Sequence, residues 1–409
     1  MFSGMDRWPQ VTLAAAVQGM RFLFPTETDP DQPGDTARTR WLGGIFMPLR
    51  GSFRALIMFD VADSILLDRL RTILGVPAER SPIFARPTPE YVRFERPPVV
   101  EAIAPIEIEP HRRIEGKVKY YEYGVVSVEL YLQFELEWSS LVEQSSRWIA
   151  GPRAEDRAMK IIHERLKLVA PALVKPYENR LTEDYYIVYL REAPGAGGAP
   201  ATAAELLALH GGEIAQIVRG ETTALSDSER QEVLQSSISY YPTDLVVPAW
   251  TAALVYDTEE GAAPTIQLLE YANTQLLEFR HYDAVLTQVL EGVYRSLDKG
   301  GGFLSRWKLA REAQRLNALR LEVTELTERI DNAIKFLSDM FYARLYRLAA
   351  SKVGVSDYRN LVDQKLRTAG ELYQFMVGKF HQARGFVLEL GVVIILIIEL
   401  IFLFRGKAM

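Results

Sequence analysis

A long apolar segment near the end of the sequence limits most strongly what this chain can be. Within residues 386–404, sixteen of nineteen residues are Val, Ile, Leu or Phe. As a helix the segment would be ~28 Å long, close to the thickness of the hydrocarbon core of a bilayer. Its apolar side chains favour insertion by about 5 to 10 kcal/mol in total, more than Glu389 and Glu399 oppose it. We therefore expect a single C-terminal transmembrane helix over 386–404.

The position of this segment predicts how the protein is anchored. A C-terminal span leaves the ribosome last, and the N-terminus shows no basic leader followed by a clean apolar run. Basic residues flank both ends of the segment, so the positive-inside rule favours an orientation only weakly. We expect a tail-anchored, single-pass membrane protein with a cytoplasmic N-terminal head.

Composition narrows the chemistry available to the head. The chain has 409 residues, of which 48% are hydrophobic, enough for two domains with proper cores. The absence of cysteine excludes disulfides, thiolate-ligated zinc, iron–sulfur clusters and cysteine nucleophiles.

Charge is distributed unevenly along the chain. Residues 303–384 contain fifteen Lys or Arg and nine Asp or Glu, a net charge of +6, which leaves −12 for residues 1–302. A basic segment beside a bilayer attracts anionic lipid headgroups, although the same charges also suit an ordinary solvated helical face. The acidic head would repel phosphates, so nucleic acid is not an expected partner of the head. A ribosome or RNA tether acting through the basic segment remains an alternative.

The first region, 1–116, has an α+β pattern. A leucine periodicity within 66–74 predicts a short helix that ends at Gly75. Apolar runs predict strands at 11–17, 44–49 and 53–59.

The second region, 117–260, contains the clearest strand pattern. Over 126–134 apolar residues alternate with polar ones such as Ser127 and Glu129, which predicts a strand with one face buried. Two helices follow within 138–169 and a strand at 185–190, and the run 245–255, interrupted by Pro248, predicts an edge strand. This order favours an α+β sheet domain with helices on one face.

The third region, 262–384, predicts a long helical stalk with coiled-coil character. Leu316, Val323, Ile330 and Leu337 recur every seven residues with further apolar residues between them, the spacing of a coiled-coil seam. A second apolar series over 362–380 leads towards the membrane segment. The spacing leaves open whether these helices pair within one chain or between subunits.

Two further features could form sites. Glu278 and His281 would share one face of a helix, as in half of a di-iron carboxylate site, but a solvated polar face is the simpler interpretation. Within the membrane segment, Gly391 permits close approach of a second helix and Glu399 could hydrogen bond across it, which favours a homo-oligomer. No phosphate-binding loop or nucleophile elbow occurs, so we expect no cofactor and no enzymatic activity.

Several short motifs resemble the "required for meiotic nuclear division" family, a domain of unknown function. They are Tyr123-Gly124-Val125-Val126, Glu183-Asp184-Tyr185 and the closing segment that starts at Leu388-Glu389. The resemblance covers about 117–404, although Leu390 stands where the family has Trp. It implies a non-enzymatic, tail-anchored protein that oligomerises on a membrane. We expect an oligomeric membrane scaffold or tether; the alternative from another class is a membrane-bound hydrolase or metal-dependent enzyme.

Overall fold

The computed structural model describes residues 48–76, 97–109, 112–151, 153–195, 198–298, 311, 314–325 and 340–406. All of these residues belong to one compact unit, Met47–Met409. The strand predicted at 11–17 and most of the strand predicted at 44–49 lie outside the described residues.

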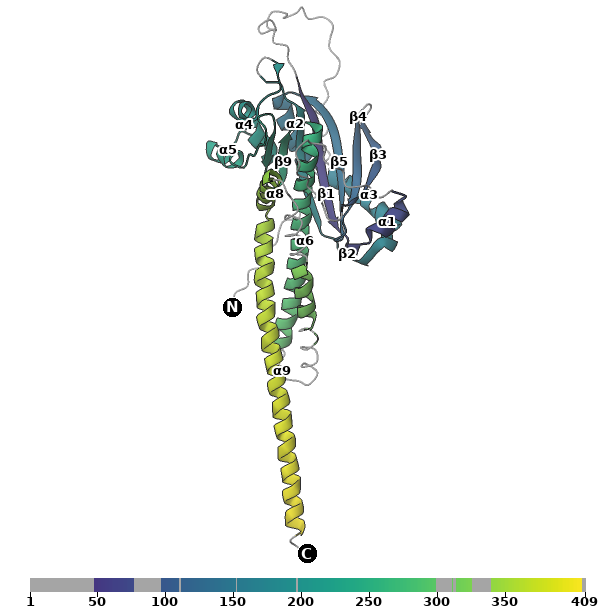
Figure 1. The fold of residues 1–409 in the computed structure, drawn as a ribbon, viewed down its shortest axis with the longest axis vertical. Coiled ribbons are helices and arrows are strands. Elements are labelled where there is room, and N and C mark those ends of the chain that lie inside the picture. The colour runs from purple at the N-terminus through teal and green to yellow at the C-terminus, as the bar shows by residue number, and fades with distance from the viewer. Residues whose placement is uncertain are drawn as a thin grey trace, which may run out of the picture. The chain divides into compact units, whose positions relative to one another are not determined.

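The centre of this unit is a seven-stranded mixed sheet (Figure 1). Its strands are β1 (Leu49–Asp60), β3 (Val99–Glu109), β4 (Arg112–Tyr120), β5 (Val125–Leu136), β7 (Thr182–Glu192), β8 (Leu245–Pro248) and β9 (Ala252–Tyr256). They lie in the order β3-β4-β5-β1-β7-β9-β8, and every neighbouring pair is antiparallel except β7 and β9. Two shorter strands, β2 (Ala62–Ile65) and β6 (Leu173–Pro176), form a separate antiparallel pair. The α+β class is confirmed.

The sheet does not follow the predicted division at residue 116. That boundary lies inside β4, and β1 pairs along its whole length with β5 and from Arg50 to Phe59 with β7. Strands from both predicted regions, 1–116 and 117–260, therefore share one sheet. The run predicted as one edge strand is two strands, because the chain turns after Pro248 and β9 lies between the edge strand β8 and β7.

Helices cover both faces of the sheet. The first face packs against α1 (Leu67–Leu74), α2 (Trp138–Ala150), α3 (Arg153–Val169) and α4 (Ala203–Arg219), with α5 (Asp227–Leu234) beside α4. As predicted, α1 ends at Gly75, which has the left-handed φ of 65° that glycine adopts readily. The second face packs against α6 (Glu259–Asp298) through residues such as Leu56 and Ile187. The prediction of helices on one face is corrected accordingly.

This second layer changes the environment of β5. The period-two pattern is confirmed, with Val126, Val128 and Leu130 buried against the first helical layer. Ser127 and Glu129, predicted to face solvent, are also fully buried because α6 lies over their face. Alternation alone does not reveal that a polar face will be covered by a helix more than a hundred residues away.

The stalk helices pack within the chain. Helices α8 (Met340–Lys352) and α9 (Val355–Gly406) contact α6, and the segment 314–325 is also helical. Leu316 and Val323 are buried in one apolar cluster with Val293 of α6 and Val362 of α9. These two heptad residues are thus covered by their own chain and are not available to another subunit. Ile330 and Leu337 lie outside the described residues.

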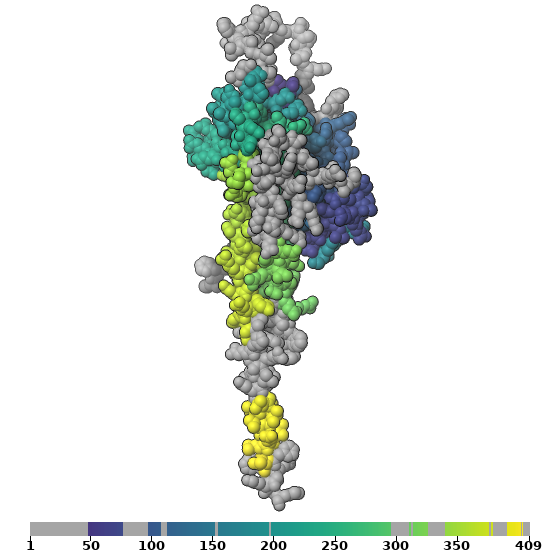
Figure 2. Space-filling view, in the orientation of Figure 1, coloured from purple at the N-terminus to yellow at the C-terminus, as the bar shows by residue number. Residues whose placement is uncertain are grey.

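The last part of α9 has no such cover. The side chains of 392–398 are all between 48% and 59% exposed, and Gly391 has no atom near the position of an added Cβ. In Figure 2 this stretch is the yellow segment nearest the C-terminus, with no other coloured residue against it in that view. In the part of the chain that the structure describes, no helix is long and apolar enough to span a membrane.

Candidate functional site

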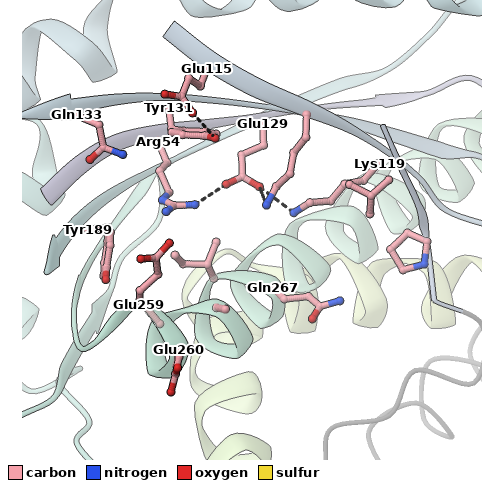
Figure 3. A pocket seen from close by; sticks show the side chains of 16 residues that line it. Arg54, Glu115, Lys119, Glu129, Tyr131, Gln133, Tyr189, Glu259, Glu260 and Gln267 are labelled. Atoms are coloured by element: carbon pink, nitrogen blue, oxygen red, sulfur yellow. Dashed lines mark hydrogen bonds and ion pairs between the residues drawn. The ribbon is translucent and has the colours of Figure 1, made fainter. Parts of the chain in front are cut away.

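A polar pocket of about 590 Å³ opens between the sheet and the first turns of α6 (Figure 3). Strands β1, β4, β5 and β7 form its floor, and α6 forms the wall opposite the floor. The charged and aromatic residues that line it are Arg54, Glu115, Lys117, Lys119, Glu129, Tyr131, Tyr189, Glu259 and Glu260. A pocket of this size suits a small molecule.

The pleat of the sheet brings these residues to one face. Side chains alternate across a strand, so Lys117 and Lys119 of β4 point the same way. Lys117 lies directly opposite Glu129 of β5, and Arg54 of β1 lies opposite Tyr131. The floor is therefore a charged cross-strand patch, which α6 partly covers.

Glu129 is the centre of this patch and is completely buried. One carboxylate oxygen lies 2.7 Å from Arg54 Nη1; the other lies 3.1 Å from Lys117 Nζ and 2.9 Å from Lys119 Nζ. Burial alone would raise the pKa of Glu129, but Lys119, Lys117 and Arg54 together hold this pKa well below its ordinary value. Glu129 is therefore ionised and binds three cations.

Lys119 and Arg54 are each held by a further contact. Lys119 also pairs with the buried Glu270 of α6, which links the sheet to that helix. Burial would lower the pKa of Lys119, but Glu129 and Glu270 raise it above its ordinary value. The guanidinium of Arg54 lies 5.3 Å from the ring centroids of both Tyr131 and Tyr189, within cation–π range. These contacts fix the two cations in place before any ligand arrives.

The residue types in the pocket lining limit its chemistry. Among the described residues that line it there is no histidine, serine, threonine or aspartate. Its polar lining consists of lysine, arginine, glutamate, glutamine and tyrosine, and fixed charges around a concave surface suit a charged ligand.

A second polar cluster surrounds the predicted pair Glu278 and His281. The structure brings these residues to the same side of α6, but Glu278 is buried and the His281 side chain is only 17% exposed, so this is not the solvated face expected from the sequence. His281 Nδ1 lies 2.7 Å from Asp60 Oδ2, and its ring stacks on Tyr177 with the ring centroids 4.6 Å apart. No group of three or more possible metal ligands occurs among the described residues. The contacts of His281 instead attach α6 to the sheet.

Glu278 is the member of this cluster whose burial is electrostatically unfavourable. Its Oε1 is buried and has no hydrogen-bond partner among the described residues. Burial raises the pKa of Glu278 well above its ordinary value, and the nearby Asp60 and Asp63 raise it further. The folded protein thus keeps a proton on Glu278 that the unfolded chain releases at lower pH.

Replacing Glu278 by glutamine is therefore expected to stabilise the protein as pH rises. Between the unfolded and folded pKa values the wild type loses stability with increasing pH, because the folded state binds more protons. Glutamine removes this loss, so Tm at pH 8 should increase by about 2–4 °C, equivalent to ~1 kcal/mol in a domain of this size. The difference in Tm between variant and wild type should disappear near pH 4. Thermal unfolding across pH 4–8 measures this difference, with Glu259→Gln on the exposed start of α6 as control. A difference in Tm that does not change with pH would contradict the raised pKa of Glu278.

The family-motif residues connect the sheet to α6. The hydroxyl of Tyr123 lies 2.8 Å from Thr274 Oγ1, and Glu183 pairs with Arg280. Burial raises the pKa of Glu183 even though Arg280 acts to lower it. The motif residues thus have structural partners in this fold.

The remaining motif residues also have structural positions. Tyr185 is buried and donates a hydrogen bond to the carbonyl of Ala249, whereas Asp184 belongs to β7 beside it. Gly124 has φ +95°, a conformation open mainly to glycine.

Sequence reasoning missed the residues of the pocket. The alternation over 126–134 predicts a solvent-facing position for Glu129, and no motif singles out Arg54 or the two lysines of β4. One signal was present: the Lys-x-Lys pattern of 117–119 places two cations on one face of a strand that leads directly into the strand of Glu129. That pattern indicates a cross-strand ion pair but not the helix that covers it.

The fold and the pocket define an α+β domain with a charged pocket, and the comparisons place that domain in a family. The sequence model of the N-terminal domain of the uncharacterised protein MJ0711 matches residues 50–263, more than half of the chain. This chain belongs to that family.

One curated relative is the uncharacterised protein MJ0711 of Methanocaldococcus jannaschii, 22% identical over 188 residues, or 46% of this chain. The match spans 58% of that relative's length. No solved structure matches the chain. This family differs in name from the one that the sequence motifs resemble.

Proposed function

We propose that this protein is a non-enzymatic membrane scaffold whose α+β head is held at a bilayer by the end of α9. The observation that carries the proposal is the uniform exposure of the apolar side chains of 392–398. Seven consecutive residues cover about two helical turns, so the helix is apolar on all sides. A helix of this kind is stable when it is surrounded by apolar material.

The neighbouring sequence supports the same anchor. Counted in the sequence, the apolar pattern runs from 386 to 404, the length of the predicted transmembrane helix, and it includes side chains that the structure does not describe. The net charge of +6 over 303–384 would favour anionic headgroups beside it. The resemblance to the "required for meiotic nuclear division" family is consistent with an anchor of this kind. Gly391 and the exposed Glu399 leave room for a second copy of the helix, so we include a homo-oligomer in the proposal.

Vesicle flotation of the purified full-length protein tests the anchor. Wild type reconstituted from detergent should float with phosphatidylcholine vesicles and resist extraction at high pH. An arginine at the centre of a span costs about 3 kcal/mol relative to an apolar residue. We therefore expect the double variant Ile394→Arg, Ile398→Arg to lose flotation at least tenfold.

The matched control places the same substitutions elsewhere on the surface. Leu209 and Leu321 are 73% and 72% exposed and lie outside α9. The double variant Leu209→Arg, Leu321→Arg should float like the wild type. If both double variants float as well as the wild type, the proposed anchor is wrong. If both lose flotation, the wild type adheres to the vesicles non-specifically.

A further inference from the structure

Three carboxylates gather where α6 packs against the end of β1. Asp60 is the last residue of β1, Asp63 belongs to β2, and the charges of both act on Glu278 of α6. Asp60 and Glu278 are buried, whereas the side chain of Asp63 is 34% exposed. We call these three residues, together with His281, the acidic junction.

The acidic junction has more carboxylates than groups that can neutralise them. In the part of the chain that the structure describes, Asp63 pairs with Lys175 at 3.1 Å, and Asp60 Oδ2 lies 2.7 Å from His281 Nδ1. Lys175 is largely exposed, so water screens its pair with Asp63. Glu278 Oε1 is buried and has no hydrogen-bond partner among the described residues. A buried carboxyl group in this position is stable only when it is protonated.

The surrounding charged and titratable groups do not supply a cation for Glu278. They come from each element that packs around the acidic junction: Tyr123 before β5, Tyr177 after β6, Glu183 of β7 with its partner Arg280, Tyr282 of α6, and Glu322 of the segment 314–325. Burial, reinforced by the nearby carboxylates, raises the pKa of all three tyrosines, so they remain neutral. Arg280 is paired with Glu183, and Glu322 adds a further negative charge.

We propose that the acidic junction is a pH-dependent latch between the sheet and α6. The latch is closed while Glu278 holds its proton. When the proton leaves, Glu278 and Asp60 are two buried carboxylates that repel each other, and the middle of α6 separates from the sheet until water reaches them. This inference goes beyond the membrane anchor and does not depend on it, because the acidic junction lies in the head.

Contacts on its other side determine what α6 stays attached to. Lys365 of α9 lies 2.6 Å from Asp283 Oδ1 and 2.5 Å from Thr287 Oγ1, both on α6. When the latch opens, α6 therefore remains with the stalk helices and loses contact with the sheet. The latch thus links proton binding to the attachment between head and stalk.

The direction of the pH dependence follows from the number of bound protons. The closed latch binds one more proton than the open latch, because burial, together with Asp60 and Asp63, raises the pKa of Glu278 when the latch is closed. Opening therefore becomes more favourable as pH rises, by about tenfold per pH unit between the ordinary and the raised pKa of Glu278.

Labelling of a buried cysteine in the full-length protein tests the latch. Ser127 lies under α6, opposite Met58 of β1, and the chain has no native cysteine. We expect Ser127→Cys to react with a thiol reagent at least tenfold faster at pH 8 than at pH 6. Each rate is divided by the rate of the exposed Leu209→Cys at the same pH, because the thiolate fraction rises with pH in both. Val128→Cys, buried on the opposite face of the sheet, should show no such increase. No increase at Ser127→Cys, or an equal increase at Val128→Cys, would overturn the latch.

Substitutions in the Ser127→Cys protein then assign the proton. Glu278→Gln should reduce the pH effect on the labelling rate to less than twofold. Asp63→Asn should make the rate level off at a lower pH, because Asp63 raises the pKa of Glu278. Glu291→Gln is the matched control, since Glu291 lies on the same helix with its side chain 64% exposed, and it should leave the pH effect unchanged. A pH effect that survives Glu278→Gln, or that is lost equally in Glu291→Gln, would contradict the assignment to Glu278.

Discussion

Replacing Glu129 by glutamine should lower the free energy of unfolding by about 3–5 kcal/mol. Glu129 is fully buried and neutralises Arg54, Lys117 and Lys119, and glutamine leaves these cations with Glu270 as their nearest buried counter-charge. Removing one member of a buried ion network leaves uncompensated charge, which explains the large expected cost. In thermal unfolding, this corresponds to a decrease in Tm of roughly 6–20 °C.

The pH dependence of this loss provides a second check. The folded pKa of Glu129 is lowered, so its contribution is fully present above the unfolded pKa and disappears as pH falls through the folded pKa. The difference between wild type and variant should therefore be largest at neutral pH and decrease in acid. Glu135→Gln at the exposed end of the same strand is the matched control. Glu135 lies 3.3 Å from Arg50 and is 56% exposed, so its loss should cost less than about 1 kcal/mol. Equal losses for the two variants would show that Glu129 is not the centre of a buried network.

Replacing Gly124 by alanine should be at least as damaging. Gly124 has φ +95°, and an added Cβ would lie 1.8 Å from the carbonyl oxygen of Ala62. That oxygen belongs to the backbone, so a change of side-chain rotamer cannot relieve the clash. We expect a loss of more than about 4 kcal/mol, or no soluble folded protein.

A second glycine tests whether this effect depends on position. Gly292, within α6, has no atom within 4 Å of an added Cβ. Gly292→Ala should leave Tm unchanged or raise it slightly, since alanine favours a helix interior by up to about 1 kcal/mol over glycine. A Gly124→Ala protein with the Tm of the wild type would refute the strained turn between β4 and β5.

The sequence predicted the local elements of this fold better than their arrangement. The alternation over 126–134 and the leucine series before Gly75 correspond to β5 and α1, because both patterns follow directly from strand and helix periods. The covering of β5 by α6 depends on residues more than a hundred positions apart. The pocket could not be predicted for the same reason. Glu129 becomes the centre of a buried ion network only when β1, β4 and α6 pack together.

The heptad pattern shows a different limit. Leu316 and Val323 have the spacing of a coiled-coil seam, and the structure buries them, but against α6 and α9 of the same chain. Spacing specifies which face of a helix is apolar and does not specify the partner. The spacing of Glu278 and His281 likewise places them on one side of a helix, yet the contact between His281 and Asp60 could not be inferred from it.

The central claim is that the end of α9 lies in a bilayer, and a depth measurement tests it most directly. The chain has no cysteine, so Leu396→Cys introduces one site for a nitroxide spin label. In proteoliposomes, we expect oxygen to relax this label much more strongly than a water-soluble nickel chelate does. Leu209→Cys, on α4 of the head, should show the reverse. If the label at position 396 is as accessible to the nickel chelate as the label at 209, the end of α9 lies in water and the proposed anchor is wrong.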